Sequence, residues 1–148
     1  MTDDVFLQPG GFHFGVAGTR ISTLLGSCVA VCLWHPARHI GGMCHFMLPG
    51  RGNGDGRFAE GAFELFRAEL ARTGTEPAQY QAKVFGGAAQ LSGGRLAAAN
   101  VAAALTLLDR DGFAVLTRDT GGTGARMLHF ELDTGDVWLR RNASRVAA

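Results

Sequence analysis

Hydrophobic and polar residues follow one another along the chain in stretches of strand or helix length. Two apolar runs, at residues 29–34 and 40–48, flank a short segment that contains Pro36, and strands joined by so short a turn pair side by side. Alternating or short apolar stretches predict the remaining strands, the last two as a hairpin; these are residues 12–16, 21–25, 79–85, 113–117, 127–132 and 137–141.

Two stretches have helical periodicity instead. Residues 58–70 carry apolar side chains three and four positions apart, and Gly74 follows as a helix stop. Residues 96–109 are rich in alanine and leucine and end before Gly112. The order of strands, helix, strand, helix and further strands predicts an α+β fold, with a mixed or antiparallel β-sheet sandwich core flanked by helices. We expect residues 1–148 to form one domain.

Composition narrows the class of protein. The 148 residues are 47% hydrophobic and 18% charged, with a formal net charge of +1, so we expect a folded core and no general attraction to nucleic acid. The three cysteines include no C-x-x-C pair, which predicts neither a disulfide framework nor a zinc ribbon. The first residues are acidic and no long apolar run follows them, so we expect neither a secretory signal nor a membrane span. We therefore expect a cytoplasmic monomer without a cofactor.

The candidate chemistry lies at the start of the first apolar run and near the end of the second. Cys28 follows Gly26 and Ser27, and His45 occupies the paired strand, so the two side chains are predicted to face each other. A neighbouring imidazole can lower the pKa of a thiol and carry its proton, which is the minimum for acyl transfer. The small Gly26-Ser27 step can point backbone N–H groups at a substrate oxyanion. The competing interpretation is that Cys28 is an inert packing residue.

A metal site is the other use of these side chains, since thiolates and imidazole suit zinc. In an extended strand Cys28 and Cys32 would lie ~13 Å apart, too far for two ligands of one ion. Cys44 and His45 are adjacent in sequence, so they point to opposite faces of a strand. The spacing therefore argues against a metal.

Several blocks resemble one protein family. Residues 22–33 contain Gly-Ser-Cys, residues 41–49 contain His-Phe-Met-Leu-Pro, and further matches follow in order at residues 83–88, at 100–101 and from 119 to 126. Together they resemble the chemoreceptor glutamine deamidases, the CheD family. The resemblance implies a sandwich shared with cysteine-dependent toxin deamidases. It also implies hydrolysis of glutamine side chains to glutamate and ammonia, through a Cys–His thioester, on the cytoplasmic region of chemotaxis receptors.

The same resemblance assigns roles to neighbouring residues. The family has a hydroxyl residue six positions before the cysteine to orient the histidine, which is Ser22 here; Thr23 would point to the other face of the strand. Thr23 and Cys44 join Gly26 and Ser27 as oxyanion or substrate-positioning candidates. The alternative function is a non-catalytic adaptor that binds receptors and a CheC-type phosphatase, a partner that the family also implies.

Overall fold

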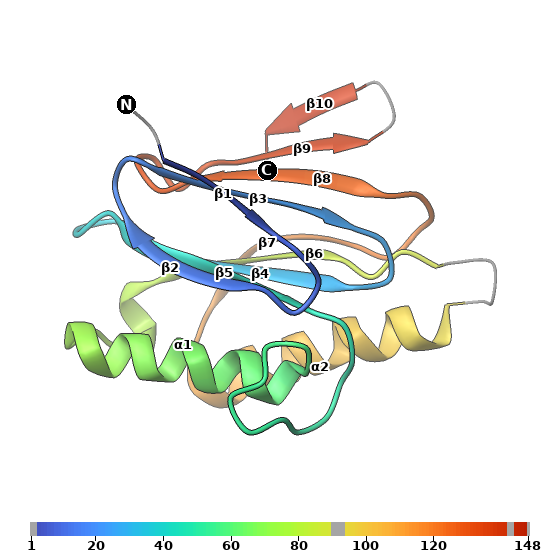
Figure 1. The fold of residues 1–148 in the computed structure, drawn as a ribbon, viewed down its shortest axis with the longest axis horizontal. Helices are drawn as coiled ribbons and strands as arrows, with labels where there is room; N and C mark the ends of the chain where they lie inside the picture. Colours follow the sequence, from blue (N-terminus) through green and yellow to red (C-terminus); the bar gives the residue numbers. More distant parts are fainter. Residues whose placement is uncertain (1–2, 90–93, 142–143, 148) are drawn as a thin grey trace.

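A computed structural model describes residues 3–89, 94–141 and 144–147, and its elements form three layers (Figure 1). An outer sheet has the strand order β1-β3-β8-β9-β10, and a central sheet has the order β2-β5-β4-β6-β7. Helices α1 and α2 cover the far face of the central sheet. The bounds are β1 Asp3–Leu7, β2 Phe12–Val16, β3 Thr19–Leu25, β4 Val29–His35, β5 Ile40–Phe46, α1 Ala59–Thr73, the 3-10 helix Pro77–Gln79, β6 Gln81–Gly86, α2 Arg95–Asp111, β7 Val115–Thr120, β8 Arg126–Glu131, β9 Val137–Arg141 and β10 Ser144–Ala147.

Both sheets are mixed, which confirms the predicted α+β sandwich. Strands β1 and β3 pair in parallel, as do β6 and β7, and the other neighbours are antiparallel. The predicted pairing of β4 with β5 is present, with Ala30 opposite His45. Strands β1 and β10 were not predicted. The two described α-helices cover the central sheet, and no helix of the described residues lies on the far face of the outer sheet (Figure 1).

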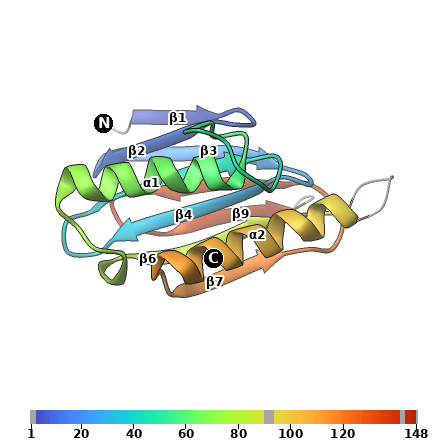
Figure 2. The same ribbon diagram turned by 90° about the horizontal axis from the view of Figure 1, so that it is seen from below.

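The two predicted helices are confirmed, and each ends at a glycine. Gly74 and Gly112 have left-handed backbone conformations and their N–H groups bond carbonyls of the last helical turn, the usual way of satisfying a helix C-terminus. Figure 2, which is seen from below, shows α1 and α2 in front of the central sheet. Helix α1 contacts β5 and β2, and α2 contacts β4 and β6. Within the described residues, no helix is long and apolar enough to cross a membrane.

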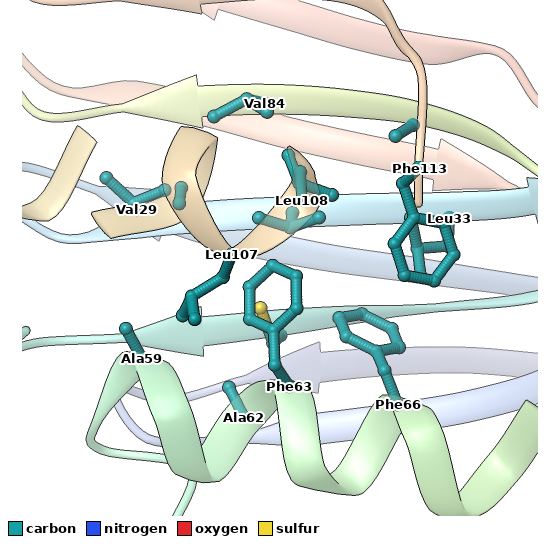
Figure 3. Packing of buried hydrophobic residues seen from close by; sticks show 14 of the residues in the cluster. Val29, Leu33, Ala59, Ala62, Phe63, Phe66, Val84, Leu107, Leu108 and Phe113 are labelled. Atoms are coloured by element: carbon teal, nitrogen blue, oxygen red, sulfur yellow. The ribbon is translucent and has the colours of Figure 1, made fainter. Parts of the chain in front are cut away.

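The central sheet is buried on both faces, so two separate cores form. One lies between the central sheet and the helices, where Phe63 and Phe66 of α1 meet Leu107 and Leu108 of α2 (Figure 3). The other lies between the two sheets and includes Leu25, Leu128 and Phe130 from the outer sheet. Residues of β5 alternate between these cores, with Met43 in the inter-sheet core and Cys44 in the helix-side core. This alternation aims the side chain of His45 at the outer sheet.

Candidate active site

Cys28 lies where the chain crosses from the outer sheet to the central sheet. It follows β3 by three residues and immediately precedes β4. Its side chain is half-buried and packs against the inter-sheet core, on the same face of the central sheet as His45. Val29 pairs with Phe46, and Ala30 with His45, so Cys28 is the diagonal neighbour of His45, within reach of a long side chain.

His45 is held at both its backbone and its ring. The turn between β1 and β2 clamps the backbone, since Gly10 N–H donates to the His45 carbonyl at 2.7 Å and His45 N–H donates to the Gly11 carbonyl at 3.1 Å. The side chain is 1% exposed. Its Nδ1 atom lies 2.6 Å from Thr23 Oγ1, and its Nε2 atom is buried without a hydrogen-bond partner among the described residues.

Thr23 determines which nitrogen of His45 carries the proton. The Thr23 hydroxyl donates its one hydrogen to the Leu7 carbonyl at 2.8 Å, so towards His45 it can only accept. The hydrogen of this second bond therefore comes from His45 Nδ1. A neutral imidazole has one N–H, so Nε2 carries the lone pair. The unpartnered Nε2 is then a base on the face of the sheet that carries Cys28.

Burial keeps both reactive groups neutral. It lowers the pKa of His45 to about 4 and raises the pKa of the Cys28 thiol above its ordinary value of 9.0, because both charged forms are poorly solvated there. The sequence predicted that His45 lowers the pKa of Cys28. In the protein without substrate, burial raises that pKa instead. At neutral pH the pair is thiol and imidazole, so proton transfer must accompany attack on a substrate.

The carbonyls of residues 26–28 each accept a hydrogen bond. Ala88 N–H donates to the Gly26 carbonyl and Gly87 N–H donates to the Cys28 carbonyl, each at 2.9 Å. The Ser27 carbonyl accepts a bond from the Asn100 side chain. Since C=O and N–H point in opposite directions across a trans peptide, the N–H groups of Ser27 and Cys28 face away from these anchors. Neither N–H group donates a hydrogen bond within the described residues.

Two predicted positioning roles do not fit the structure. Ser22 does not contact His45, since its Oγ lies 2.7 Å from Nδ1 of His129 on the opposite face of β3. Thr23 takes the place at His45 that the family spacing assigned to Ser22. Cys44 is fully buried in the helix-side core, and burial raises the pKa of its thiol to about 12. A positioning role for Cys44 therefore does not fit the structure, because the central sheet separates it from the face that carries His45.

Thr23 could have been found from the sequence alone. Ile21, Thr23 and Leu25 alternate with Arg20, Ser22 and Leu24. The two apolar residues at Ile21 and Leu25 indicate which face is buried, and a hydroxyl between them must then bond inside the core. Leu24 is the misleading residue, because it is apolar but 51% exposed.

The cysteines do not gather around a metal position. Cys32 lies in the inter-sheet core and Cys44 in the helix-side core. Within residues 3–89, 94–141 and 144–147, no three His, Cys, Asp or Glu side chains form a group able to hold an ion.

Comparisons with known proteins point to one family. The family model described as CheD chemotactic sensory transduction matches residues 47–141. A protein of Dechloromonas aromatica (strain RCB), named probable chemoreceptor glutamine deamidase CheD 3, is 51% identical over 146 residues, which cover 92% of this chain and 86% of that protein. A protein of Pseudomonas syringae pv. syringae (strain B728a), named probable chemoreceptor glutamine deamidase CheD, is 43% identical over 148 residues, with coverage of 93% and 84%.

Proposed function

This chain belongs to the CheD family, and we propose that it deamidates glutamine side chains of chemotaxis receptors with Cys28 as nucleophile and His45 as acid and base. The observation that carries the proposal is the hydrogen bond between Thr23 and His45 Nδ1, with the Thr23 proton committed to Leu7. This arrangement leaves the lone pair of Nε2 free on the face shared with Cys28. Curated relatives that are named chemoreceptor glutamine deamidases support the same reaction.

The first half of the reaction forms a thioester. His45 Nε2 takes the proton of the Cys28 thiol while the sulfur attacks the carbonyl carbon of the glutamine side chain. The carbonyl oxygen becomes an oxyanion and accepts hydrogen bonds from the N–H groups of Ser27 and Cys28. The imidazolium then protonates the amide nitrogen, the C–N bond breaks, and ammonia leaves. Cys28 now carries the acyl group, and His45 is neutral again.

The second half consumes one water molecule. His45 Nε2 removes a proton from water as the water oxygen attacks the thioester carbonyl. When the tetrahedral intermediate collapses, the C–S bond breaks and the proton on His45 returns to the Cys28 sulfur. The products are a glutamate side chain and the free thiol. One histidine therefore serves both halves, provided that its ring does not rotate, and the Thr23 bond supplies that restraint.

The substrate we propose is the cytoplasmic region of a chemotaxis receptor, which places the working protein in the cytoplasm. A CheC-type phosphatase is a proposed second partner that would compete with the receptor. A purely adaptor role is the alternative function. We favour catalysis, because an adaptor needs neither a half-buried thiol nor an imidazole with a fixed tautomer.

The test is to incubate the protein with a purified receptor cytoplasmic fragment and to follow ammonia release and glutamine-to-glutamate conversion by peptide mass spectrometry. We expect conversion by the parent and none by Cys28→Ala or His45→Ala, with all three proteins binding the fragment. Binding by the parent without conversion would instead support the adaptor.

A further inference from the structure

Asn100 of α2 links the two segments that carry the reactive groups. Its side-chain amide Nδ2 donates to the Ser27 carbonyl at 3.1 Å and to the Met47 carbonyl at 3.0 Å, which uses both of its hydrogens. Ser27 directly precedes Cys28, and Met47 lies two residues after His45. Asn100 is fully buried, so water does not compete for these bonds.

The amide of Asn100 is used as a donor only. Its Oδ1 atom is buried and has no hydrogen-bond partner among the described residues, and a desolvated acceptor without a partner is unfavourable. A residue kept for packing would not need this polar group. The feature that the site uses is therefore the pair of N–H groups, and those reach Ser27 and Met47.

The bond to Ser27 determines the direction of the next N–H group. The peptide between Ser27 and Cys28 is a rigid plane with its C=O and N–H on opposite sides. When Asn100 holds the Ser27 carbonyl on the α2 side, the Cys28 N–H must point away from α2. Ala88 and Gly87 hold the carbonyls of Gly26 and Cys28, but neither contacts the peptide between Ser27 and Cys28. Asn100 is the contact that sets this peptide plane.

We propose that Asn100 is a positioning residue that aims the Cys28 N–H at the oxyanion of the substrate. The inference rests on the proposed function, because it concerns the tetrahedral intermediate of that reaction. Without the two donors of Asn100, the peptide between Ser27 and Cys28 is free to rotate, and the N–H loses its fixed direction. Asn100 donates its two hydrogens to Ser27 and Met47 and none to the thiol or His45 Nε2, so proton transfer from Cys28 is retained.

Two reactions of Cys28 separate these effects. Deamidation passes through an oxyanion, whereas alkylation by iodoacetamide is a displacement at carbon that forms none. We expect Asn100→Leu, which keeps the approximate shape and removes both donors, to lower kcat by about 100-fold, the usual effect of losing one oxyanion donor. The KM for the receptor fragment and the alkylation rate of Cys28 should stay close to the parent values, because neither depends on an oxyanion donor. Leu107→Ala on the same helix is the control for general loss of packing, and we expect it to leave kcat unchanged.

Asn100→Asp provides a second readout and a replacement should Asn100→Leu fail to fold. A buried carboxyl has a raised pKa, and its protonated form offers one donor. The ratio of its kcat to that of the parent should therefore rise as pH falls, while the ratio of the Cys28 alkylation rates stays constant; a structural defect caused by the buried charge would move both ratios. Deamidation by the parent together with an unchanged kcat in Asn100→Leu would overturn this inference alone. A parallel fall of alkylation and deamidation in Asn100→Leu would also overturn the role proposed for Asn100. Absence of turnover by the parent would overturn both this role and the proposed function.

Discussion

The bond between Thr23 and His45 can be removed without changing the shape of the residue. Thr23→Val replaces the hydroxyl by a methyl group, which leaves the Leu7 carbonyl and His45 Nδ1 without their partner. Each buried polar group left unpaired costs about 1–3 kcal/mol, so for two such groups we expect the free energy of unfolding to fall by about 2–6 kcal/mol. The free energy of unfolding of most domains is ~5–15 kcal/mol. Most of the expected loss lies below this range, so the variant should still fold at assay temperature.

We expect Thr23→Val to lower kcat more than it lowers stability. General acid–base catalysis contributes about 10²–10⁴-fold, and a ring without a fixed tautomer loses much of this, so we expect kcat of Thr23→Val to fall by about 100-fold. Thr23→Ser keeps the hydroxyl and should recover most of the loss. Ser22→Ala is the matched control, because it removes only the bond to His129 on the other face. Deamidation of the receptor fragment measures kcat, and denaturant unfolding measures stability. A large loss of kcat in Ser22→Ala with none in Thr23→Val would refute the assignment of Thr23 as the residue that orients His45.

Three further predictions concern pH, the loop around Cys28 and the buried thiol. Because burial lowers the pKa of His45 to about 4, the acidic limb of kcat/KM should lie near pH 4; a limb near 6.5 would contradict this. Between about pH 6.5 and 4, His45 binds a proton in the unfolded state and not in the folded state. The free energy of unfolding should therefore fall by up to about 3 kcal/mol as pH drops, and denaturant titrations of His45→Gln should lack this dependence. Gly86 and Gly124 both have positive φ, but a side chain at Gly86 would strike the Cys28 carbonyl and one at Gly124 meets nothing within 4 Å. Gly124→Ala should lose about 1–2 kcal/mol of stability and Gly86→Ala more, because it adds this clash, and only Gly86→Ala should lose deamidation; equal activities would show that this contact is unimportant. Cys44→Ala should lower the melting temperature and leave kcat unchanged, since the thiol lies in the helix-side core; a lower kcat at full folding would restore its positioning role.

The elements with strong local patterns could be predicted from the sequence. Residues of β4 and β5 form continuous apolar runs because the central sheet is covered on both faces, and the glycines that end both helices have a clear local signal. Strand β1 has no such signal. It is acidic at its start, mostly exposed, and buries only Leu7 at its end. Its parallel pairing with β3 is a long-range feature that periodicity does not reveal.

The proximity of Cys28 and His45 was predictable from the sequence, whereas the residues that support them were not. His45 lies in β5 and Cys28 immediately precedes β4. A short turn joins these two strands, so the proximity of the two residues is a local property of the sequence. The hydroxyl beside His45 comes from the other sheet, and its identity depends on how two sheets stack. The contact of Asn100 with Ser27 joins residues 73 positions apart, and it depends on where α2 crosses the end of β4. Such contacts follow from tertiary packing, which residue spacing does not specify.

The most direct test of the account is to look for the acyl group on Cys28. The parent protein and a receptor fragment are mixed, quenched in acid after a fraction of a turnover, digested and analysed by mass spectrometry. We predict a peptide containing Cys28 joined to a receptor peptide, with a combined mass lower by one ammonia, and its absence in Cys28→Ala. Receptor deamidation by Cys28→Ala, or turnover by the parent with no such adduct at any quench time, would contradict a thioester on Cys28.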